Sequence, residues 1–405
     1  MIALLLAAFF TNTERVAAVA VGGGAIWTAT SGGVEQYDLP SGARLRVFTT
    51  ADGLDSNDVL QATWQDGALH IRTGRSACAL TPALAFACAP APPLPPPAPA
   101  VAQLFRGARE TGRILDGGRQ IVATDGAGLW LDGRRLTPEG QLCANHVEAL
   151  ASFRGAIWVG TFDAGVCVLE GDRFRRVAAP FRMVNDLFPA PEGLFIAATE
   201  GLYFTRDGRT FHREAAVRDR GANRIAASRR WLFVTTPAAL YAIRREGTPR
   251  VRRWARPAGS TALQAVAVSG RDVWLASEDA GVIRLRAGKF RAFDRASGLP
   301  SSWAVDVAPA SGGGVWVATL RHGAVRLGSD GAVERSGPSA WGLRIYSNDG
   351  SFLFATQHGI EGWAAPLPDP RVHALLRNRD GFWIGTEGGL ALLNGVAKPP
   401  FGGRD

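Results

Sequence analysis

Lysine is almost missing from this chain of 405 residues, although the chain is strongly basic. Of the 45 basic residues only Lys289 and Lys398 are lysines, so the net charge of +9 comes almost entirely from arginine. Charge of this kind on exposed outer strands prevents sheets from aggregating edge to edge. Ten of the basic residues lie in four short runs, at 44–48, 173–177, 250–254 and 289–293. A solvated basic edge therefore explains much of the charge, and we expect no nucleic-acid partner.

Long apolar runs and helical periodicity are also missing. Beyond the N-terminus no stretch of about 20 apolar residues occurs, so we expect no transmembrane segment in the mature chain. No 3.6-residue pattern persists over 12 residues, which argues against helices. The six histidines and four cysteines show neither CxxC nor HxxxH spacing, so we expect no metal site and no cofactor. The chain also has no distinguishing catalytic motif.

The first ten residues, MIALLLAAFF, are apolar and lack a cationic start. Two interpretations stay open: a short signal peptide cleaved near Ala7 and Ala8, or a strand that closes the fold. We therefore treat 1–14 as a leader or closing strand and 15–401 as the folded domain.

The cysteine count is low but even. Cys78 and Cys88 flank a short segment that could be a hairpin, and Cys143 and Cys167 are close enough in sequence to pair across neighbouring units. An even count in an exported chain predicts two disulfides. Buried free thiols are the alternative.

What the chain has in abundance is a repeat. The phrase AIWTATSGGV at 25–34 returns as AIWVGTFDAGV at 156–166, DVWLASEDAGV at 272–282 and RDGFWIGTEGGLALL at 379–393. Its Thr or Ser recurs mostly every 37 to 43 residues, the length of a propeller blade. These anchors fall at 30, 73, 124, 161, 199, 236, 277, 319, 356 and 386.

Each unit reads as four short strands separated by Gly, Asp or Pro. We expect the Trp of the second strand, as at Trp27 and Trp274, to fill the wedge between adjacent sheets. The Thr can bond nearby backbone as the turn begins, and the glycines after it permit a positive φ. "GTEGG" at 385–389 is thus a turn between strands, because no helix and no Lys follows its glycines.

Ten units predict an all-β propeller of four-stranded antiparallel blades. We favour one ring of nine or ten blades, with a smaller ring and degenerate extra units as the alternative. The Pro-rich insert at 89–100 is the one clear linker, and the ninth unit is too short for an outer strand. The C-terminal VAKPPF or the N-terminal apolar run would close the ring.

The segment SGLPSSWAVDVAPASGGGVWVATLRHGAVRL at 297–327 resembles the two-component regulator propeller repeat, as do 52–73 and 371–393 more loosely. The resemblance implies an extracytoplasmic β-propeller, periplasmic or secreted in a bacterium, that acts as a sensor. Because no kinase signature is present, a separate sensor kinase would have to carry the signal.

Ligands of propellers usually bind where the loops between strands meet around the central channel. The loops after the second strand offer a mixture of acids, histidines, an arginine and an aromatic ring: Asp125, Phe162, Asp163, Glu200, Glu278, Asp279, Arg321, His322, His358 and Glu387. The loops before the first strand add Asp55, Asn57, Asn145, His146, Asn185, Trp303 and His373. This mixture suits a polar ligand such as a glycan or a peptide.

Three functions follow from this pattern. The first is a non-catalytic binding or sensor propeller, and the second is an enzyme of the streptogramin-lyase or hydrolase type. For the enzyme, His322 with Glu278 is the one pairing worth testing. The third is a structural scaffold that binds a partner protein on the loop face.

Overall fold

The computed structural model describes residues 6–95, 103–248, 250–336, 341–348, 351–363, 366–379 and 381–394. These residues form ten separate antiparallel sheets of three to five strands, as the ten repeat units predict. Within these ranges there is no α-helix, and the helical turns are two short 3-10 segments, η1 (Thr50–Asp52) and η2 (Arg295–Ser297). The predicted all-β propeller of repeated blades is therefore confirmed.

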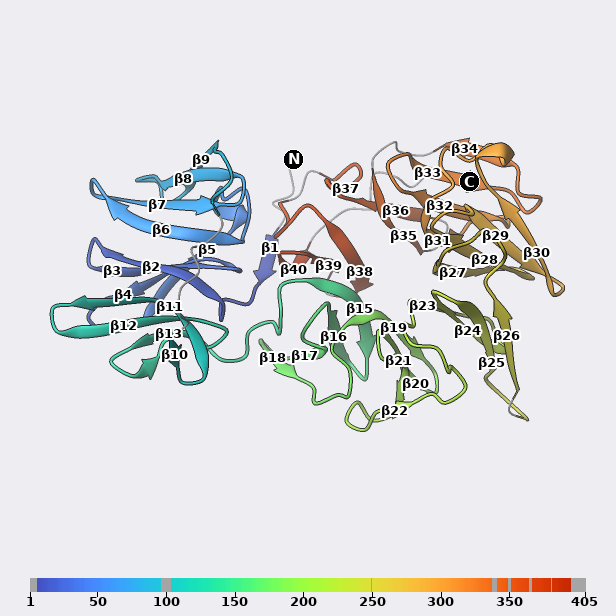
Figure 1. Ribbon diagram of the computed structural model, residues 1–405, viewed down its shortest axis with the longest axis horizontal. Helices are drawn as coiled ribbons and strands as arrows, with labels where there is room; N and C mark the ends of the chain where they lie inside the picture. The colour runs from blue at the N-terminus through green and yellow to red at the C-terminus, as the bar shows by residue number, and fades with distance from the viewer. Residues whose placement is uncertain are drawn as a thin grey trace.

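Seven of the ten sheets form a closed ring, on the right in Figure 1. Their first strands line the axis and pack in the order β15, β19, β23, β27, β31, β35, β38 and back to β15. The first three blades of the ring are β15 (Val147–Phe153), β16 (Ala156–Thr161), β17 (Val166–Glu170) and β18 (Arg173–Arg176); β19 (Val184–Ala190), β20 (Gly193–Ala198), β21 (Gly201–Thr205) and β22 (His212–Arg213); and β23 (Arg224–Ala227), β24 (Trp231–Thr236), β25 (Ala239–Arg244) and β26 (Val251–Ala255). The fourth and fifth are β27 (Leu263–Ser269), β28 (Asp272–Ser277), β29 (Val282–Arg286) and β30 (Lys289–Phe293); and β31 (Ala304–Pro309), β32 (Val315–Thr319), β33 (Gly323–Leu327) and β34 (Val333–Ser336). The last two are β35 (Gly342–Asn348), β36 (Ser351–Thr356) and β37 (Gly359–Ile360); and β38 (Val372–Asn378), β39 (Gly381–Thr386) and β40 (Gly389–Asn394). The β35–β37 blade has three strands, as its short sequence predicts.

The N-terminal apolar run completes the last blade of the ring. Strand β1 (Leu6–Phe10) pairs antiparallel with β40 and becomes the outermost strand of that sheet. The Phe10 ring stacks on Trp383 at 5.7 Å between centroids and meets the edge of Phe174 at 5.5 Å. The closing-strand interpretation thus describes this segment, and cleavage near Ala7 and Ala8 would cut through β1.

The other three sheets form an open lobe between β1 and β15, on the left in Figure 1. We call it the three-blade lobe. It contains β2 (Val16–Gly22), β3 (Ala25–Thr30), β4 (Gly33–Asp38) and β5 (Arg44–Phe48); β6 (Val59–Gln65), β7 (Ala68–Thr73), β8 (Ser76–Leu80) and β9 (Phe86–Pro90); and β10 (Leu104–Phe105), β11 (Ala108–Asp116), β12 (Arg119–Asp125), β13 (Gly128–Leu131) and β14 (Arg134–Arg135). The β2–β5 blade is central, because β2 packs against both β6 and β11.

The expected single ring of nine or ten blades is therefore wrong, and the smaller ring with additional units is right. The ring closes after seven blades because β15 packs against β38 and not against a blade of the lobe. Chain order and spatial order differ in the lobe, because the central β2–β5 blade comes first in the chain and the two outer blades follow it one after the other. The Pro-rich insert at 89–100 begins with the last two residues of β9 and continues toward β10, and its residues 96–100 lie outside the described ranges.

The two ends of the lobe differ in how they meet solvent. On the β6–β9 blade, Gln61, Thr63 and His70 are exposed and alternate with buried residues, so its outer face is polar. On the β10–β14 blade, Phe105 packs edge-on against Trp130 at 5.6 Å, and the Arg106 guanidinium lies over the Trp130 ring at 4.8 Å. Both outer blades thus carry polar or charged residues on the side without a neighbouring blade, as the terminal repeats of a stacked repeat protein do.

The repeated Thr acts as predicted. The Thr30 hydroxyl donates to the carbonyl of Gly33 at 2.7 Å, and Thr161 and Thr386 make the same bond to Gly165 and Gly389. In one unit the expected anchor, Thr199, is displaced by one residue. Ala198 pairs with Gly201 in the same way as Thr30 pairs with Gly33, so the buried Ala198 occupies the anchor position of that unit.

The repeated Trp also lies between blades. Trp274 is fully buried, and Trp27 stacks at 6.0 Å on Trp64 of the neighbouring blade. Trp316 packs in the same way on Phe352, with 4.1 Å between ring centroids. Burial of a large aromatic ring is worth several kcal/mol, so these contacts hold adjacent blades together.

Candidate functional site

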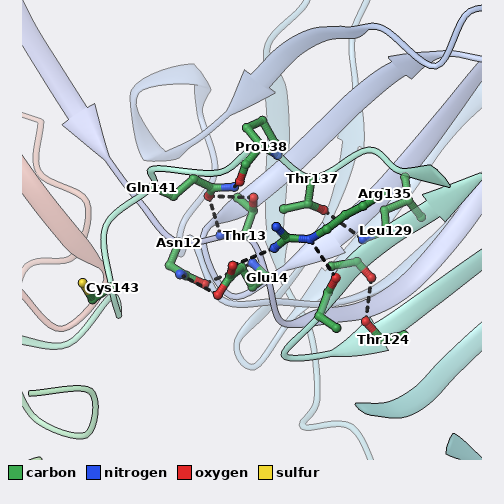
Figure 2. Close-up of polar contacts among 12 residues, drawn as sticks. Asn12, Thr13, Glu14, Thr124, Leu129, Arg135, Thr137, Pro138, Gln141 and Cys143 are labelled. Carbon is green, nitrogen blue, oxygen red and sulfur yellow. Dashed lines mark hydrogen bonds and ion pairs between the residues drawn. The ribbon is translucent and has the colours of Figure 1, made fainter. Parts of the chain in front are cut away.

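The three-blade lobe is fastened to the ring by side-chain to backbone hydrogen bonds. Asn145, just before β15, accepts from the Asn12 amide at 2.5 Å and donates to the carbonyls of Asn12 and Ser31. Beside it, Gln141 accepts from the amide and the hydroxyl of Thr13, both at 2.9 Å, as Figure 2 shows. These bonds fix the loops of the lobe against the mouth of the ring.

A cavity of about 560 Å³ lies at this junction, and we call it the junction cavity. Its walls come from both parts of the molecule and carry charges of both signs. The lobe contributes Glu14, Arg15 and Asp58, and the ring contributes Arg182, Asp369 and Arg371. Four of these six charges are paired within their own part. Glu14 pairs with Arg135 at 2.7 Å (Figure 2), Arg15 with Asp125 at 3.0 Å, and Arg371 with Asp369 at 2.8 Å.

The first strand of most ring blades carries a bulge near its start, and the bulge brings polar residues toward the channel. The register of β15 against β16 skips Glu148, and that of β38 against β39 skips His373. A bulge redirects a side chain while the pairing on either side continues. A smaller cavity of about 180 Å³ lies in the channel, and both Glu148 and His373 line it.

Deeper in the channel two buried carboxylates join neighbouring blades. Asp186 of β19 accepts from the Ile225 amide of β23 at 2.9 Å, and Asp306 of β31 accepts from the Ile345 amide of β35 at 3.0 Å. Burial raises the pKa of Asp186, and it raises the pKa of Asp306 to about 6 although Arg224 and the backbone donors act in the opposite direction.

At the mouth of the channel, His146, Glu148, His373 and Glu387 form a group that we call the His–Glu cluster. Nε2 of His146 lies 2.9 Å from Oε1 of Glu148, and Nδ1 of His373 lies 3.7 Å from Oε2 of Glu148. Nε2 of His373 lies 3.1 Å from Oε1 of Glu387, whose other oxygen pairs with Arg371. The cluster thus links the first and last blades of the ring.

Burial and charge act in opposite directions on this cluster. Burial disfavours the charge on His146, but the contact with Glu148 and the charge of Glu387 outweigh it and raise the pKa of His146. Burial likewise opposes ionisation of Glu148 and Glu387. Contacts with the two histidines outweigh it for both groups, helped by Arg371 at Glu387, and lower both pKa values. The cluster therefore favours the ionised form of both carboxylates beside the imidazole rings.

Several of the predicted ligand-face residues come together here. Asp163 and Glu387 line the junction cavity, and the Phe162 ring stacks on His146 at 4.8 Å with 13° between the planes. Asp125 pairs with Arg15 of the cavity wall at 3.0 Å. Glu200 lies at the edge of this group, where it accepts from the Arg182 amide at 3.3 Å.

The remaining predicted residues belong to other blades, and none of them lines the junction cavity. Arg321 lies over the Trp341 ring, and Asp279 accepts from the Thr261 amide at 2.8 Å. The amide of His358 donates to Thr356 within its own turn.

The proposed pairing of His322 with Glu278 is not formed. Glu278 accepts from Gln264 at 2.5 Å, and Nδ1 of His322 lies 3.1 Å from the carbonyl of Leu320. Both residues lie in the described ranges, and no hydrogen bond or ion pair joins them there. Their contacts are with their own blades.

The residues before the first strand fall into two groups. Asn145 and Asn57 bind backbone across the junction, Asn57 by donating to the Gly388 carbonyl at 3.3 Å, and His146 and His373 join the cluster. Asp55 bonds to Thr73, Asn185 to the Ala222 carbonyl, and Trp303 is exposed.

Sequence reasoning missed Glu148, Asp369 and Arg371. Glu148 could have been found from its place one residue after the start of the first strand, where His373 stands in the last blade. Asp369 and Arg371 lie in a turn that copies no other unit, so the repeat gave no signal for them.

The four cysteines behave as two different pairs. Cys78 and Cys88 form a disulfide between β8 and β9, as predicted. Cys143 and Cys167 are buried free thiols, so the second predicted disulfide is not formed. They are neighbours nonetheless, because the Cys143 amide donates to the sulfur of Cys167 at 3.3 Å.

No family model matches the sequence, and no curated protein is similar to it in sequence. Solved structures are similar in fold. The extracellular domain of the one-component system BT4673 of B. thetaiotaomicron is 14% identical over 95% of this chain and 70% of that one, with a TM-score of 0.52. The corresponding domain of the hybrid two-component system BT3049 is 15% identical over 92% and 61%, also at 0.52.

A third structure is an inactive His-to-Ala variant of virginiamycin B lyase from Staphylococcus aureus with quinupristin. It is 12% identical over 62% of this chain and 95% of that one, with a TM-score of 0.51. At these identities the similarities establish the propeller fold. The neighbours include extracellular domains of two-component systems, in agreement with the resemblance of the repeat.

Among the described residues, no helix has the length and hydrophobicity needed to span a bilayer.

Proposed function

We propose that this chain is a non-catalytic, extracytoplasmic ligand-binding propeller of the sensor type. The observation that carries the proposal is the junction cavity, whose walls combine loops of the lobe with loops at the mouth of the ring. A glycan or a short peptide is the expected ligand, because carboxylates, guanidinium groups and amide side chains together line the cavity. Closure of the lobe onto the ligand would be the conformational signal.

Two observations support the extracytoplasmic location and the sensing role. The Cys78–Cys88 disulfide suits an oxidising compartment such as the periplasm or the medium. Extracellular domains of hybrid two-component systems have the same fold. On this proposal a separate sensor kinase or another partner protein receives the signal.

The proposal is tested by screening the labelled chain on glycan and peptide arrays, followed by calorimetry on the hits. Arg15→Gln and Asp58→Asn change two walls of the cavity, and Arg291→Gln on the exposed edge of β30 is the matched control. We expect specific hits whose affinity falls roughly tenfold in each cavity variant, the loss of one charged hydrogen bond. An absence of hits, or hits that all three variants bind equally, would contradict the proposal.

A propeller enzyme is a second candidate, and the His–Glu cluster favours it. Two imidazoles there face two carboxylates, which is the arrangement of general acid–base catalysis. In the similar lyase structure, replacing one His gives a catalytically inactive protein. If this candidate is right, incubation with quinupristin should give a product by mass spectrometry, and His146→Ala and His373→Ala should abolish it. Unchanged quinupristin would exclude that substrate.

A further inference from the structure

We infer that His146, Glu148 and His373 form a binding site for a divalent transition-metal ion at the mouth of the ring. Each residue offers one ligand atom, and these atoms all lie within 4.8 Å of one another. Two imidazoles and a carboxylate are ligands that Zn²⁺ and its neighbours in the first transition row prefer. The site is independent of the proposed sensor role, because it needs no organic ligand.

The separations suit a single ion. Two ligands that bind zinc at 2.0–2.1 Å in tetrahedral geometry stand about 3.3 Å apart. Oε1 of Glu148 lies 2.9 Å from Nε2 of His146, and Oε2 of Glu148 lies 3.7 Å from Nδ1 of His373, one distance on each side of that value. Small rotations of the side chains would therefore bring all three ligands to bonding distance.

The surrounding groups orient the ligands. Glu387 faces Nε2 of His373 at 3.1 Å and is itself held by Arg371. A proton on Nε2 that is donated to Glu387 leaves Nδ1 unprotonated and free to bind metal, which is the carboxylate–histidine–metal arrangement. The Phe162 ring, stacked on His146 at 4.8 Å, fixes the plane of the other imidazole.

The location leaves a coordination position open. His146 lines the junction cavity, and Glu148 and His373 line the smaller cavity in the channel. The ion would thus lie between the two spaces with three protein ligands, as in zinc sites that keep a position for water or for a bound molecule.

Cobalt(II) is the probe, because its visible absorption reports a site with nitrogen and oxygen ligands. The tag-free chain, treated with a chelator and dialysed, is titrated with Co²⁺ at pH 7.5 and then with Zn²⁺ in competition. His146→Asn and His373→Asn remove one ligand each, and Glu387→Gln weakens the group that orients His373. His322→Asn is the matched control, since it removes a histidine of another loop that lies outside the cluster.

We expect one Co²⁺ per chain, displaced by Zn²⁺. The two ligand variants should lower the affinity at least about 100-fold and Glu387→Gln about tenfold, while His322→Asn binds as the wild type does. Circular dichroism checks that each variant folds. If His373→Asn does not fold, His146→Asn decides, because its side chain is 29% exposed. No binding by the wild type, or equal binding by all variants, would overturn the inference.

Discussion

The ring and the three-blade lobe are built from the same repeat, but they treat the faces of their blades differently. In the ring every blade has a neighbour on each side, because the first strands pack in a closed order from β15 to β38 and back. In the lobe only the central β2–β5 blade has two neighbours. The outer face of the β6–β9 blade is polar, and Trp130 covers that of the β10–β14 blade together with Phe105 and Arg106.

The difference shows that the repeat by itself does not decide closure. The contact between second-strand Trp and neighbouring blade is present in both parts, at Trp27 in the lobe and at Trp316 in the ring. The two parts differ in two respects. The outer blades of the lobe carry residues that suit a solvent-facing surface, and the last blade of the ring is completed by β1. The chain can therefore combine a rigid ring with an open lobe, and it places a cavity where they meet.

Removal of residues 1–10 should have the largest effect on this comparison. Without β1 the edge of β40 is unpaired, and the stacking of Phe10 on Trp383 is lost. We expect the free energy of unfolding of the ring to fall by about 5 kcal/mol or more, measured by urea denaturation. Removal of residues 1–5, which leaves β1 intact, is the control. Equal stability of the two truncated chains would show that β1 does not close the ring.

Replacement of one Trp in each part should sharpen the contrast. Trp274→Ala empties a fully buried wedge between ring blades and should cost about 3–5 kcal/mol. Trp130→Ala, at the end of the lobe, loses contacts with Phe105 and Arg106 and should cost about 1 kcal/mol. Urea denaturation measures both, with the exposed Trp303→Ala as the reference. A larger loss of stability in Trp130→Ala than in Trp274→Ala would contradict this difference between the ring and the lobe.

The buried carboxylate of Asp306 makes the stability of the ring depend on pH. Its pKa is raised from 3.8 to about 6. Between pH 3.8 and about pH 6, Asp306 is therefore protonated in the folded ring but ionised in the unfolded chain. This contribution to stability is complete below pH 4 and is lost as the pH rises to 6, about 3 kcal/mol in all. Asp306→Asn should therefore gain stability relative to the wild type over that range, measured by urea denaturation at each pH. Asp172→Asn, at an exposed position, should show no such trend.

The sequence was sufficient for the blades because their signals are local. The Thr closes a turn with a carbonyl three or four residues away, and where a unit has the repeated second-strand Trp, that Trp stands three residues before the Thr or Ser. The one displaced anchor, Thr199, arose where Ala198 fills the same position without a hydroxyl. Local patterns of this kind survive without any knowledge of the neighbouring blade.

Closure and the His–Glu cluster depend on contacts between distant residues. Val16 and Val147 occupy the same position in the first strands of their blades, opposite Thr30 and Thr161, so the sequence does not reveal which one Gly385 of the last blade meets. His146 and His373 likewise come together only because the ring closes after seven blades. The cluster could therefore not be predicted from the sequence while the number of blades in the ring was unknown.

An engineered disulfide between the first and last blades of the ring shows whether the ring closes after seven blades. A Cβ at Gly385 would lie 3.0 Å from Cβ of Val147, so Gly385→Cys with Val147→Cys should form a disulfide, detected in peptides by mass spectrometry. Gly160→Cys with Val184→Cys has the same geometry between consecutive blades, with 3.1 Å between the corresponding atoms, and is the positive control. The closed seven-blade ring predicts disulfides in both pairs and none between Gly385→Cys and Val16→Cys. A disulfide in that last pair, with none at Val147, would mean a single ring of ten blades and contradict the account.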